Sequence, residues 1–203
     1  MDEREAAFAT EAVEYADTDL RVRFSLNIAT LLGPYSRFDE ELLRSFSALL
    51  CIASDAGEDM LPIGEASGIL IDCSRVADAG ESISELLDAR SQDDYEIYRA
   101  FFVDDEWRDE FVETIGDEPK NLLHVHRLFV GKPFRGRGLG GRLLATLNRI
   151  DVVPKSTVVA LLPSVKDEQD AYSPEATARL NRQCESAGFM PWKKTGFLYN
   201  YVP

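Results

Sequence analysis

The residues best suited to chemistry lie in one stretch, 132–150, where glycine and arginine alternate at the start of an apolar helical pattern. Glycine lets the backbone approach a ligand closely, arginine supplies positive charge, and the first N–H groups of a helix have no partner within that helix. Such a stretch can serve a dinucleotide, an RNA strand or the diphosphate of a coenzyme. The alternative is an ordinary turn with solvated charges. Its basic residues are Lys132, Arg135, Arg137, Arg142 and Arg149, and its glycines are Gly136, Gly138, Gly140 and Gly141.

The only two histidines of the chain, His124 and His126, come just before this stretch. They belong to the apolar, β-branched and aromatic run 121–130, which predicts a buried strand, and their spacing places both on one face of it. A neutral imidazole with a pKa near 6.5 can take a proton from an amine, directly or through water. The alternative is that both histidines only pack against a neighbouring strand. A bulge in the strand would change which face each one occupies.

The charge of the chain is very uneven. The net charge is −14, yet the range 121–155 holds seven basic residues against one acid, a net of +6, so the rest carries −20. A small basic region in an acidic protein indicates one compact anionic ligand rather than a long polyanion. We therefore expect no nucleic-acid partner.

Two of the three ligands fit the glycine stretch poorly. Gly136–Gly141 matches G-x-G-x-x-G, but five residues separate Val130 from Gly136, and the next strand ends at 162–164 without the acid that would bind a ribose. Arginine–glycine segments that bind RNA are disordered and repeated, whereas this one continues into an apolar helical stripe. A coenzyme diphosphate on the helix N-terminus is the remaining interpretation.

The elements that must position these residues follow from periodicity and capping signals. The order of elements in the C-terminal half indicates an α/β sheet with parallel neighbours. Ser84 can cap a helix predicted over 82–102. Ser173 and Pro174 can begin a helix predicted over 173–189, and Gly188 can end it. We predict strands at 20–28, 60–74, 121–130 and 157–163, a final strand or hairpin after 189, and helices at 38–57, 82–102, 104–115, 138–150 and 173–189.

The stretch closely resembles the signature of the GNAT superfamily of acetyl-CoA-dependent N-acetyltransferases, [Q/R]-x-x-G-x-[G/A]. Arg135-Gly136-Arg137-Gly138-Leu139-Gly140 matches it, and Ala187-Gly188-Phe189 stands where the family has its later Gly-Phe pair. The resemblance covers about residues 121–200. It implies one α/β (α+β) domain over 1–203, a mixed central sheet flanked by helices. Residues 1–120 would form a divergent half with acidic helices, and 121–203 the coenzyme-binding half.

The resemblance also implies a coenzyme site and an activity. The pantetheine arm of acetyl-CoA would pair like a strand with the backbone before the glycine loop, and the diphosphate would lie on the loop. The implied activity is transfer of an acetyl group to a primary amine by direct attack in a ternary complex. The coenzyme-binding residues would be Leu128, Phe129, Val130, Arg135, Gly136, Arg137, Gly138, Leu139, Gly140 and Gly141.

The catalytic residues are less well defined by the resemblance. His124 falls about where several relatives have a base glutamate, and His126 is the alternative base. Relatives often have an acid tyrosine four residues before the glycine of the Gly-Phe pair, and Cys184 occupies that position here. A thiol can protonate a thiolate, but a lone cysteine is more often a small buried apolar residue. The replacement acid would be Tyr172, Tyr199 or Tyr201, or none. This departure leaves a non-catalytic acyl-CoA-binding or sensing protein as the alternative function.

Partners and location follow from what the sequence lacks. The acidic N-terminus has no signal-peptide pattern and no apolar run approaches a membrane span, so we expect a cytoplasmic protein without a membrane partner. Three distant cysteines without a C-x-x-C motif predict neither disulfides nor a metal site. The expected acceptor is a small-molecule or peptide amine, and a cationic one if acidic side chains line its cleft. Relatives often form sheet-edge homodimers.

Overall fold

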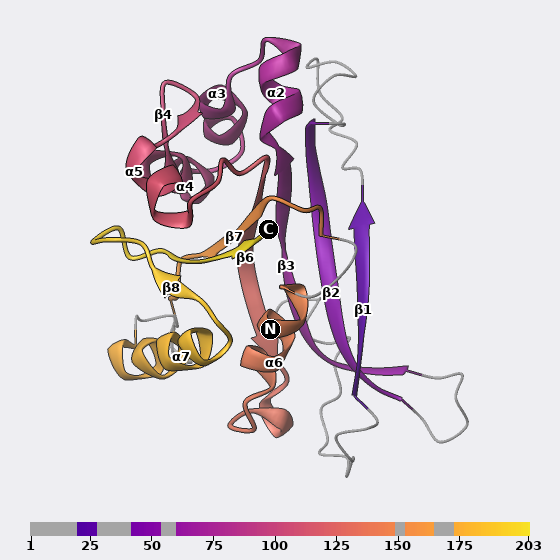
Figure 1. Ribbon diagram of the computed structural model, residues 1–203. Coiled ribbons are helices and arrows are strands. Elements are labelled where there is room, and N and C mark those ends of the chain that lie inside the picture. The colour runs from indigo at the N-terminus through magenta and orange to yellow at the C-terminus, as the bar shows by residue number, and fades with distance from the viewer. Residues whose placement is uncertain (1–19, 28–41, 54–59, 149–152, 165–172) are drawn as a thin grey trace.

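The computed structural model describes residues 20–27, 42–53, 60–148, 153–164 and 173–203, and its main feature is one central sheet (Figure 1). The strands are β1 (Leu20–Asn27), β2 (Leu43–Ala53), β3 (Met60–Asp72), β6 (Asn121–Val130), β7 (Thr157–Leu161), β8 (Met190–Pro191) and β9 (Leu198–Val202). Their order is β1-β2-β3-β6-β7-β9-β8. Each neighbouring pair is antiparallel except β6 and β7, which are parallel.

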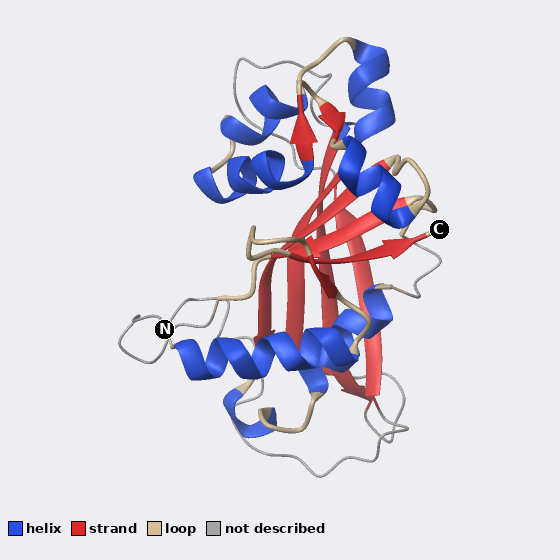
Figure 2. Cartoon of the chain, turned by 60° about the vertical axis from the view of Figure 1, so that its left-hand side comes forward, coloured by secondary structure: helices blue, strands red, loops and turns tan. Residues whose placement is uncertain are grey.

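Helices lie around this sheet in two groups. Figures 1 and 2 show α2–α5 at one end of the sheet and α6 and α7 towards the other. The predicted mixed α/β sheet flanked by helices is confirmed, but the parallel neighbours predicted for the C-terminal half are limited to β6 and β7, since β9 is antiparallel to β7. The helices are α2 (Cys73–Ala79), α3 (Ile83–Asp88), α4 (Gln92–Phe101), α5 (Asp109–Ile115), the 3₁₀ turn η3 (Lys132–Phe134), α6 (Leu139–Leu147) and α7 (Pro174–Ser186); β4 (Phe102–Val103) and β5 (Glu106–Trp107) form a separate two-stranded sheet.

Each face of the sheet has its own apolar core, because successive side chains of a strand point to opposite faces. The first core contains Leu122 of β6 and packs under α3, α4 and α5. The second core contains Leu123 and Val125 of the same strand and packs under α6 and α7. The strands β3, β6, β7 and β9 contribute side chains to both cores.

The prediction of a helix over 38–57 is wrong for the residues in this range that the structure describes. Residues 43–53 form β2, which lies between β1 and β3, and 38–41 and 54–57 lie outside the described residues. Leucines at 42, 43, 49 and 50 match a helical spacing, but Phe46, Ala48, Leu50 and Ile52 also alternate, and all four lie in the second core. Pairing with a strand on each side overrides the helical preference of this segment.

The helix predicted over 82–102 is two helices, α3 and α4. The cap is Ser82 rather than Ser84, and the chain restarts at Ser91, whose side chain accepts a hydrogen bond from the Asp94 N–H. The helix predicted over 104–115 begins later, at Asp109. The strands predicted at 20–28, 60–74, 121–130 and 157–163 and the helices begun by Leu139 and by Pro174 are confirmed to within a few residues.

Candidate functional site

The strand β6 extends beyond its parallel neighbour. Its residues Asn121–Val125 pair with Thr157–Leu161 of β7, and within the described parts of the chain no strand continues that ladder beside 126–130. On its other side β6 stays paired with β3 as far as Val130. Among the described residues, this leaves one backbone edge of β6 at 126–130 without a strand partner.

The direction of the backbone groups on this edge follows from one hydrogen bond. The Gly131 N–H donates to the Ile63 carbonyl on β3, at 2.8 Å. Backbone groups alternate sides along a strand, so those of Leu128 and Val130 point away from β3 and towards the exposed edge. The Val130 carbonyl already accepts a hydrogen bond from Arg135 Nε at 2.8 Å, which leaves the N–H groups of both residues and the Leu128 carbonyl on this edge.

A bulge in β6 separates the two halves of the strand. Ser67 of β3 pairs with Arg127 and Gly68 pairs with Val125, so His126 is the extra residue. A Cβ on Gly68 would lie 1.9 Å from the His124 carbonyl oxygen, which shows how closely the two backbones approach here. Despite the bulge, the rings of the two histidines lie together, with centroids 4.3 Å apart.

The glycine loop leads into α6 in the way that the sequence predicts. Gly136 and Gly138 have φ values of 78° and 73°, in the left-handed region that favours glycine. Gly138 is the N-cap of α6 and provides no side-chain cap, and the first backbone bond of the helix runs from the Arg142 N–H to the Gly138 carbonyl. The N–H groups of 139–141 therefore form an N-terminus without a side-chain cap.

Two of the predicted coenzyme-binding glycines also have a packing role. A Cβ on Gly140 would lie 3.4 Å from Leu128 Cδ2, and one on Gly141 would lie 3.3 Å from the Gln183 carbonyl oxygen. Both glycines are buried, whereas the residues 135–138 before them are exposed. Gly140 and Gly141 thus bring α6 close to β6 and α7.

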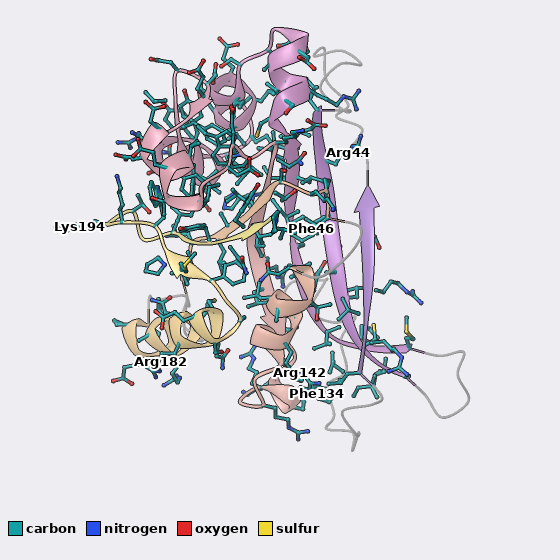
Figure 3. The ribbon with its side chains drawn as sticks, viewed as in Figure 1. Arg44, Phe46, Phe134, Arg142, Arg182 and Lys194 are labelled. Carbon is teal, nitrogen blue, oxygen red and sulfur yellow. The ribbon has the colours of Figure 1, made fainter. Side chains whose placement is uncertain are left out.

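The positive charge of this region lies over the end of β6. The guanidinium carbons of Arg127 and Arg135 lie 5.5 and 5.6 Å from the centre of the Phe129 ring. Arg137 of the glycine loop is exposed, and Figure 3 shows Arg142 near the start of α6. The structure therefore brings the predicted strand residues and the predicted loop residues together at one end of the sheet.

The histidines form a cluster with a carboxylate that the sequence analysis missed. His124 Nδ1 lies 3.1 Å and His126 Nε2 lies 2.6 Å from the same oxygen, Asp94 Oδ1. Asp94 and His124 are buried, whereas the side chain of His126 is 31% exposed. The other carboxylate oxygen, Oδ2, accepts hydrogen bonds from Ser91 Oγ at 2.9 Å and Arg90 Nε at 3.4 Å.

The pKa values in the cluster favour an ionised carboxyl and a neutral inner imidazole. Burial alone raises the pKa of Asp94, but the hydrogen bonds from His124 and His126 hold it well below its usual range. Burial is the largest influence on His124 and lowers its pKa, against the raising effect of Asp94. The neutral ring of His124 can then donate an N–H group to the carboxylate.

A signal for Asp94 was present in the sequence. It precedes Ile97 and Phe101 of α4 by three and seven residues, so it lies on the apolar stripe of that helix, whereas its neighbour Asp93 is exposed. An acid on a buried helical stripe needs a partner. The spacing alone did not show that this partner is a pair of histidines, His124 and His126, on another element of the fold.

Cys184 and the tyrosines do not join this cluster in the described structure. Cys184 is fully buried in the second core, on the face of the sheet opposite to Asp94, and burial raises the pKa of its thiol to about 12. Tyr199 is buried in the first core, where burial raises its pKa, and the Tyr201 hydroxyl donates to Asp117. Tyr172 lies outside the described residues.

Comparison with known proteins adds one resemblance. No family model and no curated protein matches the chain. Among solved structures, the chain is similar to a crystal structure of an agmatine N-acetyltransferase mutant in its apo form, with 16% identity and a TM-score of 0.36. The match covers 72% of this chain and 58% of that chain, and a likeness of this size assigns no family. Separately, none of the helices in the described residues is long and apolar enough to cross a membrane.

Proposed function

We propose that this protein is an acyl-CoA-dependent N-acyltransferase that moves an acetyl group from acetyl-CoA to a primary amine. The observation that carries the proposal is the direct continuation of the exposed β6 edge, through a basic glycine loop, into the N-terminus of α6. An extended, amide-containing arm that ends in a diphosphate matches these features in that order.

The fit to the coenzyme rests on complementary groups. The amides of a pantetheine arm can pair with the N–H groups of Leu128 and Val130 and with the Leu128 carbonyl, as an added strand would. The diphosphate suits the helix N–H groups of 139–141, with Arg135 and Arg137 as countercharges. The sequence resemblance to GNAT enzymes implies the same residues.

The proposed reaction is a direct attack. The amine nitrogen bonds to the thioester carbonyl carbon, the C–S bond breaks, and the amine proton goes to a base. His126 is the better placed base, because its side chain is partly exposed whereas His124 is buried. If His126 donates its Nε2–H to Asp94, its Nδ1 keeps the lone pair that accepts the proton. An N–H of the β6 edge would stabilise the oxyanion.

A non-catalytic acyl-CoA sensor on the same fold is the second candidate. The observation that favours it is the burial of Cys184 at the position where the resemblance places an acid. An enzyme without a dedicated acid would release the thiolate to solvent, or the thiolate would take the proton from the amine nitrogen once that nitrogen has bonded to the carbonyl carbon. Turnover with amines, measured by release of free thiol from acetyl-CoA, separates the enzyme from the sensor.

Binding is tested first, by the melting temperature of the protein with acetyl-CoA, CoA or NAD at about 1 mM. A ligand present at 100 times its Kd adds about 2.7 kcal/mol to the stability of the folded state. We expect a shift with both CoA species and none with NAD. Arg137→Glu should remove the shift. Lys194→Glu, at the tip of the segment between β8 and β9, should keep it (Figure 3). No shift with either CoA species would refute the proposal.

A further inference from the structure

We propose that Asp94, His124 and His126 form a binding site for one divalent transition-metal ion, with Zn²⁺ as the ion that fits best. This goes beyond the proposed transferase function and does not depend on it. The spacing of the cysteines predicts no metal site, but the ligands proposed here are two imidazoles and a carboxylate.

The ligand atoms already converge. One atom from each residue lies within 4.8 Å of the other two, and Asp94 Oδ1 is 3.1 Å from His124 Nδ1 and 2.6 Å from His126 Nε2. Bonds of about 2.0–2.1 Å from zinc to nitrogen and oxygen place two ligands of a tetrahedron about 3.3 Å apart. Shifts of less than about 1 Å would therefore admit the ion.

The donor set determines the class of ion. Two imidazoles and one carboxylate make a three-ligand set of the kind that binds zinc with a fourth position for water. Hard cations such as Mg²⁺ and Ca²⁺ prefer oxygen ligands alone, and soft Cu(I) prefers sulfur. All three cysteines are buried and lie outside the cluster, so thiolate ligation does not compete.

The elements around the cluster hold the ligands in place. Strand β6 is paired on both sides at His124, with Ile69 and Ala160, which fixes the backbone of that ligand. Ser91 and Arg90 bind Oδ2 of Asp94 and leave Oδ1 directed at the histidines. Such outer contacts commonly orient metal ligands. The positive charge of Arg90 disfavours binding of a cation, so a substitution that removes this charge should tighten metal binding.

Access is from the side of His126. Its side chain is 31% exposed, whereas those of His124 and Asp94 are 4% and 2% exposed. An ion would enter past His126 and keep its water on that side. A cluster that serves only as a hydrogen-bonded part of the core would have the same metal-free geometry but would not bind added metal.

The metal would also affect the proposed catalysis, and this consequence rests on the proposed function. An imidazole that binds a metal through Nε2 keeps its proton on Nδ1 and cannot accept another. Zinc should then inhibit acetyl transfer reversibly if His126 is the base. Failure of this inhibition alone would count against the base assignment, since metal binding itself is measured without coenzyme or amine.

The test uses the full chain, stripped with a chelator and titrated with Zn²⁺ in competition with a chromogenic chelator. We expect one ion per chain with a Kd in the micromolar range or below, and visible d–d absorption with Co²⁺ but no thiolate charge-transfer band. His126→Gln should weaken zinc binding at least tenfold and, since its side chain is partly exposed, should keep the native circular dichroism. Asp94→Asn should weaken it likewise.

The matched control is Asp93→Asn, which removes an exposed acid from the same turn of α4. It should bind zinc like the wild type. The proposal is overturned if the stripped wild type binds no zinc in this range, or if His126→Gln binds zinc as tightly as the wild type does.

Discussion

At the scale of single residues, the unusual feature is a buried carboxylate shared by two imidazoles. Burying an ionised carboxylate is costly unless hydrogen bonds compensate it, and Asp94 has four donors within 3.4 Å. Removing one donor leaves the charge less compensated, so each member of the cluster depends on the others. This coupling makes the cluster sensitive to pH.

Lowering the pH should destabilise the metal-free protein. Burial lowers the pKa of His124, so below its usual value of 6.5 the unfolded chain takes up a proton that the folded state does not. The unfolded state then binds more protons than the folded state. The free energy of unfolding therefore decreases as the pH is lowered, by up to about 1.4 kcal/mol per pH unit. The depressed pKa of Asp94 acts in the same direction below about pH 4, where the stability it contributes is lost.

Urea denaturation in chelator, between about pH 5 and 8, measures this dependence. His124→Asn is the informative variant, because an asparagine amide can replace the Nδ1–H donor but does not titrate in this range. Its stability should vary less with pH than that of the wild type. Equal slopes in the two proteins would contradict the assignment to His124.

The thiol of Cys184 provides a second prediction for a single residue. Because it is fully buried with a pKa raised to about 12, it should react with thiol reagents only after unfolding. Cys184→Ala should lower the free energy of unfolding by about 1 kcal/mol, since it removes one buried atom. The kcat of the folded variant for acetyl transfer should stay close to the wild-type value. A large loss of kcat would instead support Cys184 as the acid.

At the scale of elements, β6 organises the site. Its first half is paired on both sides, its bulge carries His126, and its second half offers an exposed edge that leads to the glycine loop. The bulge depends on the close approach of Gly68, where a Cβ would lie 1.9 Å from the His124 carbonyl oxygen and 2.9 Å from Phe46 Cε1. Both of these contacts are rigid, so neither can move aside easily.

Gly68→Ala should therefore be strongly destabilising, by about 3 kcal/mol or more, or should prevent folding. The matched control is Gly116→Ala at the end of α5, where a Cβ meets nothing within 4 Å but the φ of 75° is unfavourable for alanine. That change should cost only about 1–2 kcal/mol. Soluble yield and the urea midpoint compare the two variants, and equal stability would contradict the close approach at Gly68.

Local signals predicted the elements that hold the coenzyme loop. Capping residues, a largely apolar strand-forming run and the glycine-rich loop identify β6, the start of α6 and α7. They failed at β2, whose apolar residues fit both a helical and a strand periodicity. Pairing with β1 and β3 determines that this segment is a strand. Asp94 was missed because its partners lie on another element, so its role depends on tertiary packing that no local spacing records.

At the scale of the whole molecule, one sheet lies between two apolar cores and contributes side chains to both. The strands β3, β6, β7 and β9 contribute to both, so neither core can lose its strands while the other keeps them. The ranges 1–120 and 121–203 also share this sheet, with β3 paired to β6 along nine positions. We infer that the two cores unfold together.

Tryptophan fluorescence tests this inference, because both tryptophans, Trp107 and Trp192, lie in the first core. Far-UV circular dichroism reports instead on all helices and strands, including α6 and α7 over the second core. The two transitions in urea should have the same midpoint if unfolding is cooperative. A fluorescence transition complete before the change in circular dichroism would show that the cores unfold separately.

The pairing of both histidines with Asp94 has a practical consequence. Since the chain contains no other histidine, every imidazole resonance in a nuclear magnetic resonance spectrum of the protein comes from this one cluster. Tautomer, protonation and exchange at the cluster can be followed without site-specific labelling or assignment by mutation of other histidines. The protein thus carries a reporter at the place where its chemistry is proposed to occur.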